Sequence, residues 1–211
     1  MAKKAKKAKQ AASPSPVAAN SGPHLVRDVA MIGQEESNWC WAAVAQSVLA
    51  LLRDRNSRQQ DLVRGHIERS GRSYTCEAPH DGHRDNGTCN SSSCTGGCND
   101  LHRVDIALEQ AGISVDELSI DDAPGFADIQ AQVRANRPIP CVVRWSSGGG
   151  HAVIICGWSV EQGRSQVFVL DPANAAAGQP VTPHKIAHDS LVDNYRQGGR
   201  IGEVRFSYSV A

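Results

Sequence analysis

A cysteine lies between two tryptophans at the start of an apolar stretch, NWCWAAVAQSVLALL (38–52). Apolar residues recur there at intervals of three and four, which predicts a helix over about 39–53 that is capped by Ser37 or Asn38. A thiol at a helix amino terminus faces unsatisfied backbone N–H groups and the positive end of the helix dipole, and both favour the thiolate. Cys40 is therefore a candidate nucleophile.

A nucleophilic thiol needs a base, and one of the eight histidines has a suitable context. His151 follows three glycines and opens the strand-like run HAVIICGW, and glycines there would let a substrate backbone approach closely. The other histidines lie near the amino terminus, in a polar loop or in no such neighbourhood. Cys141 and Cys156 lie inside apolar strand runs, so we interpret them as buried structural thiols.

The third catalytic residue is predicted from the pairing of two strands. If HAVIICGW and SQVFVL form an antiparallel hairpin around 161–164, His151 falls opposite residues 172–174. Asp171 and Asn174 are the polar side chains near that point, and either could accept the imidazole N–H. A carboxylate would also stabilise the imidazolium, so we expect Asp171 to take this role.

Gln34 lies six residues before Cys40, on the segment that enters the predicted helix. Its amide and the Cys40 backbone N–H could both donate hydrogen bonds to the oxyanion of a tetrahedral intermediate. We therefore expect Gln34, Cys40, His151 and Asp171 to share one site.

Together these residues resemble the papain-like cysteine protease superfamily. The likeness rests on Gln34 followed after five residues by Cys-Trp-Ala, on GHAV (150–153) and on GW (157–158), and it extends over about 31–208. The combination of SNWCWAA with a later LDP more closely resembles the bacterial branch, which includes staphopain-like and plant-pathogen effector proteases.

The resemblance implies an α+β fold, in which a helical lobe led by the Cys40 helix packs against an antiparallel sheet lobe bearing His151. It implies peptide-bond hydrolysis through a thioester on Cys40, with His151 as general base and acid, Gln34 as oxyanion donor and Asp171 as histidine orienter. It implies no metal and no organic cofactor. The asparagine with a following Ser-Trp motif, which the plant relatives use, is missing here.

The rest of the chain also predicts an α+β layout, with helices first and strands second. Further helices are expected at 57–69, 100–111, 126–135 and 186–196. Strands are expected in IPCVVRW, HAVIICGW, SQVFVL and at about 201–210.

A Cys-rich insert at 76–98 is polar and rich in glycine, so it cannot form a core of its own. It contains Cys76, Cys89, Cys94, Cys98, His80 and His83. We expect two disulfides, because the cysteine spacing lacks the paired C-x₂-C knuckles of strong zinc sites. Zinc or free thiols are the alternatives.

Residues 1–23 form a basic Ala/Lys/Pro/Ser-rich tail with five of the 22 Lys and Arg residues. This composition predicts disorder, and residues 24–211 are expected to form one domain. The tail lacks interleaved aromatics, and no stretch reaches 18 apolar residues, so we expect neither a nucleic-acid nor a membrane partner. The expected partner is a protein or peptide substrate, and the expected state is a monomer.

The amino terminus lacks the apolar region of a standard secretory signal. We therefore expect either secretion by another route or a cytoplasmic protein. Two other functions remain open: a transglutaminase-like or amidase-type Cys-His-Asp acyltransferase, and a zinc-stapled interaction module in which Cys40 has no catalytic role.

Overall fold

The computed structural model describes residues 21–53, 56–69, 75–76, 94–95, 99, 102–117 and 123–210. Its helices are α1 (Cys40–Arg53), α2 (Gln59–Arg69), α3 (Val104–Gln110), α4 (Phe126–Arg134) and α5 (His188–Asn194). Its strands are β1 (Ser21–Leu25), β2 (Thr75–Cys76), β3 (Cys94–Thr95), β4 (Ile113–Glu117), β5 (Ile139–Trp145), β6 (Gly150–Glu161), β7 (Arg164–Leu170), β8 (His184–Ala187) and β9 (Gly199–Val210). A short 3-10 helix, η1, spans Pro172–Asn174. The α+β class is confirmed.

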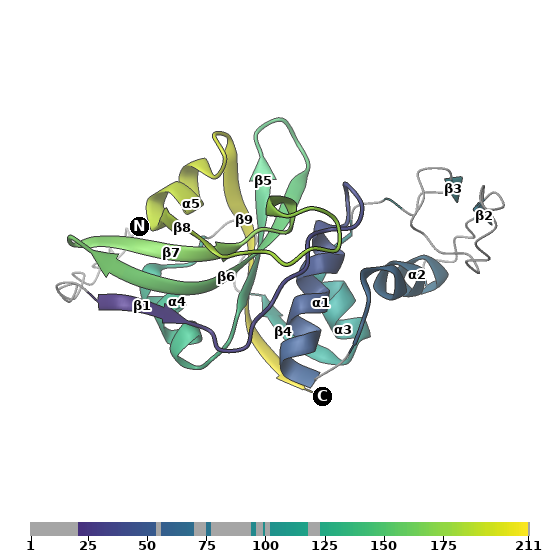
Figure 1. Cartoon of the computed structure of the whole chain (residues 1–211), viewed down its shortest axis with the longest axis horizontal. Helices are drawn as coiled ribbons and strands as arrows, with labels where there is room; N and C mark the ends of the chain where they lie inside the picture. The colour runs from purple at the N-terminus through teal and green to yellow at the C-terminus, as the bar shows by residue number, and fades with distance from the viewer. Residues whose placement is uncertain are drawn as a thin grey trace, which may run out of the picture.

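The main sheet of the described residues is antiparallel, with the strand order β4-β9-β5-β6-β7-β8 and with β1 paired to β6. Figure 1 shows α1, α2 and α3 gathered at one side of this sheet, and α4 and α5 at the other. The central strand β6 therefore separates two layers of helices.

Strand β6 contributes to two hydrophobic cores. Ala152, Ile154 and Cys156 pack in the core that contains α1, whereas Val153 and Ile155 pack in the core that contains α4. Successive side chains of a strand point to opposite faces, so a strand buried on both faces has no polar alternation. This explains why HAVIICGW is an almost continuous apolar run.

The helices predicted at 39–53, 57–69, 100–111 and 126–135 are present as α1 to α4, each within four residues of the predicted ends. The largest difference is at α3, for which the sequence predicts a beginning at residue 100. It begins at Val104, its N-cap residue is Arg103, and no side chain caps it. Asn99 instead bonds the segment that leads into α1, accepting from the backbone N–H of Asn38 at 2.8 Å.

The helix predicted over 186–196 is wrong at its beginning. Ile186 and Ala187 belong to β8, which pairs with β7, and α5 starts only at His188. Pairing with an available sheet edge outweighs local helix propensity at these two positions.

Strand β1 begins at Ser21, three residues before the predicted start of the domain at residue 24. A Cβ atom on Gly157 would lie 2.6 Å from the carbonyl oxygen of His24, so β1 can pair here only because Gly157 has no side chain. Residues 1–20 lie outside the described residues, as does the predicted disorder of the tail.

The Cys-rich insert is described only at two short strands, where the backbone of Cys76 pairs with that of Cys94. The cysteine side chains of the insert and both of its histidines lie outside the described residues, so the two disulfides stay a prediction. Within the described part of the chain, no helix is long and apolar enough to cross a bilayer.

Candidate active site

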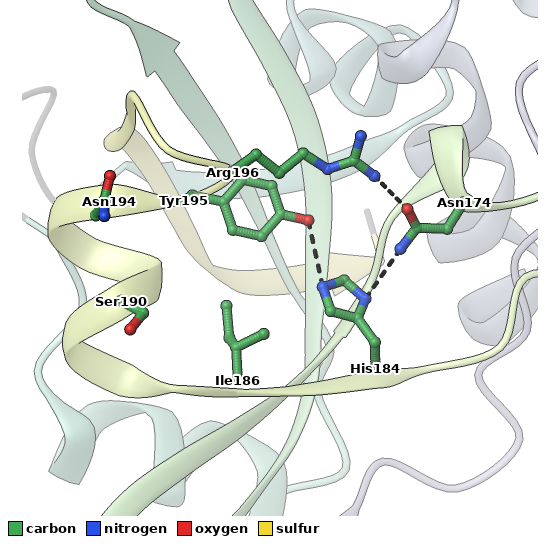
Figure 2. Close-up of a pocket in the computed structure, with 7 residues that line it drawn as sticks. All are labelled: Asn174, His184, Ile186, Ser190, Asn194, Tyr195 and Arg196. Carbon is green, nitrogen blue, oxygen red and sulfur yellow. Dashed lines mark hydrogen bonds between the residues drawn. The ribbon is translucent and has the colours of Figure 1, made fainter.

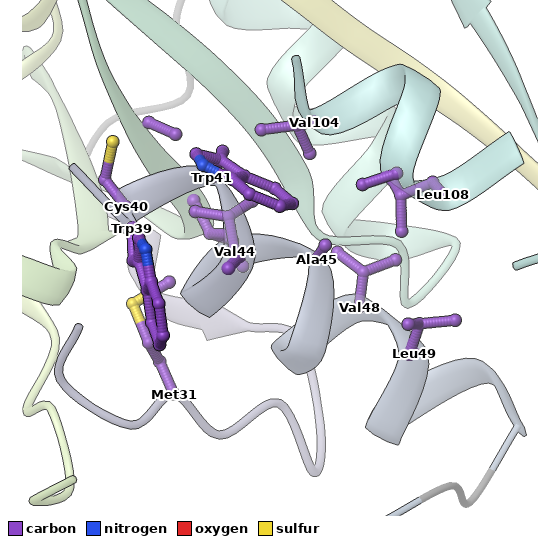
Figure 3. Close-up of a cluster of buried hydrophobic side chains, with 14 of the residues drawn as sticks. Met31, Trp39, Cys40, Trp41, Val44, Ala45, Val48, Leu49, Val104 and Leu108 are labelled. Carbon is purple, nitrogen blue, oxygen red and sulfur yellow. The ribbon is translucent and has the colours of Figure 1, made fainter. Parts of the chain in front are cut away.

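Cys40 is the first residue of α1, and its side chain is only 5% exposed. The neighbouring Trp41, with Val44 and Val48, belongs to the buried face of the helix. In Figure 3 the Cys40 sulfur projects beyond the start of the helix, away from that face. The helix is thus anchored by its apolar stripe while the thiol is held at its amino end.

The segment before α1 is fastened to the turn that follows β7. The backbone N–H of Gln34 donates to the carbonyl of Pro172 at 3.1 Å, and that of Val181 donates to Met31 at 2.9 Å. A Cβ atom on Gly33 would lie 2.5 Å from the carbonyl oxygen of Ala176, so the two backbones touch. These contacts position the Cys40 segment against the turn that begins at Asp171.

His151 bridges the thiol and a buried carboxylate. Its Nε2 lies 2.7 Å from Oδ1 of Asp171, whose side chain is completely buried. The Cys40 side chain lies beside the same imidazole, where it helps to raise the pKa of His151, and both residues line one cavity. The structure therefore brings Cys40, His151 and Asp171 into one chain of contacts.

The charges and hydrogen bonds at this site favour an ion pair between the imidazolium of His151 and the carboxylate of Asp171. Burial alone would lower the pKa of His151, but hydrogen bonds to Asp171 and Cys40, with their negative charges, outweigh burial and raise the pKa from 6.5 to about 9. Burial alone would raise the pKa of Asp171, but its bonds to His151, Tyr195 and the backbone lower it to about 2. At neutral pH the imidazole is thus cationic and the carboxylate anionic.

Asp171 is held from behind by residues that sequence reasoning missed. The Tyr195 hydroxyl donates to Oδ2 at 2.5 Å, and Nη2 of Arg196 lies 2.8 Å from the same oxygen. Oδ1 accepts from the backbone N–H of Ala173 at 2.9 Å in addition to its bond with His151. The YR pair carries no local signal for this role, because α5 and the turn after it bring the pair to Asp171 only in the fold.

Asn174, the other candidate for orienting the imidazole, does not contact His151. Its Nδ2 lies 3.1 Å from Nδ1 of His184, and its Oδ1 accepts from Arg196. Figure 2 shows these side chains around a cavity of about 530 Å³, into which the Tyr195 ring also projects. Cys40 and His151 are not among the residues lining that cavity.

Gln34 lies in the expected segment, but its amide is engaged locally. Its Nε2 donates to the carbonyls of Glu36 at 2.9 Å and Ser37 at 2.8 Å, and its buried Oε1 has no hydrogen-bond partner among the described residues. For Gln34 to donate to an oxyanion, its amide would first have to break one of these two hydrogen bonds. The predicted role of Gln34 therefore stays a prediction.

A separate cavity of about 320 Å³ opens beside Cys40 and His151. Its helical side includes Trp41, His102 and Arg103, and its sheet side includes Val142, Arg144 and Gly150. Trp41 contacts His102 edge-on, with ring centroids 4.9 Å apart, so this wall is aromatic as well as basic. The cavity provides the space that a substrate of Cys40 requires.

The two other described thiols are in a different environment. Cys141 and Cys156 are 1% exposed and lie in apolar strands. Burial raises the pKa of both thiols, that of Cys156 to about 12. Both therefore stay protonated and unreactive at neutral pH, as the sequence predicted.

Among the described residues, no group of three or more His, Cys, Asp and Glu side chains could hold a metal ion. The sequence matches no protein-family profile and no curated protein.

Proposed function

We propose that this protein is a papain-like cysteine endopeptidase of the bacterial branch, which hydrolyses peptide bonds through a thioester on Cys40. The observation that carries the proposal is the continuous chain from the thiol of Cys40 through His151 to the buried carboxylate of Asp171. A nucleophile, a base and an orienter in hydrogen-bond reach are the arrangement that covalent acyl transfer requires.

The surroundings of the chain support the same proposal. A helix that begins at the nucleophile packs against an antiparallel sheet that carries the base, as expected for a papain-like fold. The sequence likeness at Gln34, Cys40 and GHAV points in the same direction.

The reaction follows from the charges. The Cys40 thiolate attacks the carbonyl carbon of the scissile bond, and negative charge develops on the carbonyl oxygen. As the first residue of α1, Cys40 offers a backbone N–H that has no acceptor within the helix, and this group can stabilise the oxyanion.

His151 then transfers its proton to the leaving amine, which departs and leaves the acyl group on sulfur. The neutral imidazole removes a proton from water, the hydroxide oxygen bonds the thioester carbon, and the Cys40 thiolate is released. Asp171 holds the ring orientation through both steps and stabilises the imidazolium.

The test is to incubate the full chain with a mixed peptide library and to identify products by mass spectrometry. Wild type should produce new amino and carboxyl termini, and Cys40→Ala should produce none while its circular dichroism is unchanged. Cys156→Ala is the matched control, because that thiol lies in the core and should leave cleavage intact.

Addition of a primary amine separates hydrolysis from acyl transfer. A hydrolase gives mainly free carboxyl products, whereas an acyltransferase gives mainly amide adducts. Cleavage by Cys40→Ala, or adducts as the main product, would contradict the proposed function.

A further inference from the structure

A completely buried glutamine on α2 bonds the segment that carries Gln34. The Oε1 atom of Gln59 accepts from the backbone N–H of Glu35 at 3.0 Å, and its Nε2 donates to the carbonyl of Gly33 at 3.1 Å. A backbone N–H only donates and a carbonyl only accepts, so these two partners fix the orientation of the amide. They belong to the two peptide units that flank the Cα atom of Gln34. One buried side chain therefore holds both sides of this residue.

The backbone of Gln34 is also held from the opposite direction. Its own N–H donates to the carbonyl of Pro172 at 3.1 Å, and the carbonyl of Gly33 accepts a second bond from the N–H of Gly178 at 3.2 Å. Because peptide units are planar, fixing the units on both sides of a residue fixes its φ and ψ. The direction in which the Gln34 side chain leaves the backbone is therefore set by these contacts.

Gln59 also bonds the helix that begins at Cys40. Its Nε2 lies 3.3 Å from Oε1 of Gln46, which is a residue of α1. Burying an amide is unfavourable unless its polar groups are paired, and here the oxygen and the nitrogen both have partners. The amide of Gln59 thus connects the segment of Gln34 to the helix of the thiol.

The two donors expected at the oxyanion belong to these two connected elements. The backbone N–H of Cys40 is at the first residue of α1, and the amide of Gln34 is on the segment before it. Both donors must lie about 2.7–3.1 Å from the oxyanion, so the relative position of the two elements matters. The Gln34 amide now donates to the carbonyls of Glu36 and Ser37. Exchanging one of these bonds for a charge-assisted bond, which is roughly twice as strong, is favourable only once the oxyanion has formed.

We propose that Gln59 is a positioning residue for the oxyanion site and acts on the reaction through Gln34. This inference rests on the proposed function, because the attack of Cys40 on a peptide carbonyl is the step that forms the oxyanion. Gln59 is not among the residues that line the cavity beside Cys40. Its replacement should therefore weaken stabilisation of the transition state and leave the binding of the substrate unchanged.

The first experiment measures peptide hydrolysis by Gln59→Met, which keeps the approximate size of the side chain and removes the amide. We expect kcat to fall about tenfold with KM unchanged, as for a small misplacement of a catalytic group. Gln59→Asn keeps a buried amide that is one methylene shorter and cannot bond both peptide units, so its kcat should fall too. Unchanged kcat in both variants, or a change confined to KM, would overturn the inference.

Gln60→Met is the matched control for these variants. Gln60 is the next residue of α2, and its Nε2 donates to the side chain of Glu35 at 3.3 Å instead of to the backbone. This variant removes a glutamine from the same helix and leaves the peptide units around Gln34 bonded, so it should keep the wild-type kcat. A loss as large as that of Gln59→Met would overturn the inference.

The second experiment makes the Gln59→Met change in a Gln34→Ala background. If Gln59 acts through Gln34, its effect on kcat should disappear once the Gln34 amide is absent. A purely structural role of Gln59 predicts the same loss of kcat in both backgrounds. Equal losses would overturn the inference and leave the proposed function intact.

The third experiment separates the oxyanion from the thiol by means of two reagents. With a peptide aldehyde, made from a sequence that the wild type cleaves, the Cys40 sulfur bonds the carbonyl carbon, the carbonyl oxygen takes a proton from His151, and no group leaves. With iodoacetamide, the sulfur bonds the methylene carbon as iodide leaves, and no oxyanion forms. Gln59→Met should bind the aldehyde about tenfold more weakly than wild type and should react with iodoacetamide at the wild-type rate.

Two results of this third experiment would contradict the inference. Equal losses with both reagents would show a general disturbance of Cys40 and would overturn the role of Gln59 alone. A wild-type protein that neither cleaves peptides nor binds peptide aldehydes would overturn the proposed function and the inference together.

Discussion

Two histidines lie near Asp171, and their pKa values shift in opposite directions. His151 bonds the carboxylate directly, and its pKa rises to about 9. The pKa of His184 is lowered because burial disfavours its charged form, while Asp171 attracts the cation and Arg196 repels it. The carboxylate attracts both cations, but its attraction outweighs burial only for His151, which hydrogen-bonds it directly.

The difference between the two histidines follows from how the two oxygens of Asp171 are used. Tyr195 and Arg196 occupy Oδ2 of Asp171, so Oδ1 is the oxygen left for His151. The bonds from Tyr195 and Arg196 offset part of the negative charge of Asp171 near His184. They also hold the carboxylate so that Oδ1 points to His151. We infer that Tyr195 is a positioning residue, because it acts on the imidazole through Asp171.

The largest effect is expected when the carboxylate of Asp171 is removed. Asp171→Ala should lower turnover by roughly 10²–10⁴-fold, because the imidazole loses its orientation and its cation loses support. Asn174→Ala should stay near wild type, since Asn174 contacts His184 and Arg196 instead of His151. Peptide hydrolysis at saturating substrate measures both. If Asn174→Ala were the crippling change, the assignment of Asp171 would be wrong.

The pH profile should show the raised pKa of His151. Activity requires the imidazolium, so it should fall as pH rises through about 9. Asp171→Asn keeps the shape of the side chain but removes its charge, so the pKa of His151 drops and the alkaline limb moves to lower pH. An alkaline limb at the same pH in both proteins would show that the carboxylate does not support the imidazolium.

A smaller effect is expected for Tyr195, which donates a hydrogen bond to Oδ2 of Asp171. Tyr195→Phe should lower kcat about tenfold, equivalent to about 1.4 kcal/mol, because a hydrogen bond to a charged group is lost. KM should not change, since Tyr195 does not line the cavity beside Cys40. His184→Gln is the control and should be close to wild type. A change confined to KM would contradict a positioning role.

The smallest expected effect is on stability, and it has opposite signs for the two histidines. The raised pKa of His151 adds stability that is complete below 6.5 and is lost as pH rises through about 9. The lowered pKa of His184 costs stability as pH falls through 6.5, because the folded state resists its protonation. Denaturant unfolding of wild type, His151→Gln and His184→Gln between pH 5 and 10 measures how each histidine changes the free energy of unfolding with pH. If the two histidines changed it with the same sign, the opposite pKa shifts would be wrong.

The residues of the proposed catalytic site could be brought together from the sequence because their local signals are strong. The apolar stripe of α1 fixed the position of Cys40, and the hairpin turn fixed the register of β6 with β7. Glu161 pairs with Arg164 and Ile154 with Leu170, with one register shift between them. Extended past Leu170, this register places residue 173 opposite His151, so Asp171 lies two residues from that point.

The missed elements depend on contacts distant in sequence. β1 is the segment SGPHL, whose Gly and Pro argue against a strand, and it forms because Gly157 lets it pair with β6. Tyr195 reaches Asp171 across 24 residues, after the chain has passed through β8 and α5. The amide of Gln34 was placed in the correct segment, but its bonds to nearby carbonyls were not foreseeable from spacing.

We propose that His151 and Asp171 make Cys40 a nucleophile, and the rate at which iodoacetamide alkylates Cys40 tests this proposal. Peptide mapping at pH 7 gives separate rates for Cys40, Cys141 and Cys156 in wild type and in His151→Ala. Cys40 should react far faster than the two strand thiols, and the His151→Ala variant should lose most of that advantage. Equal rates for Cys40 and Cys156 in wild type, or a Cys40 rate unaffected by His151→Ala, would contradict the account.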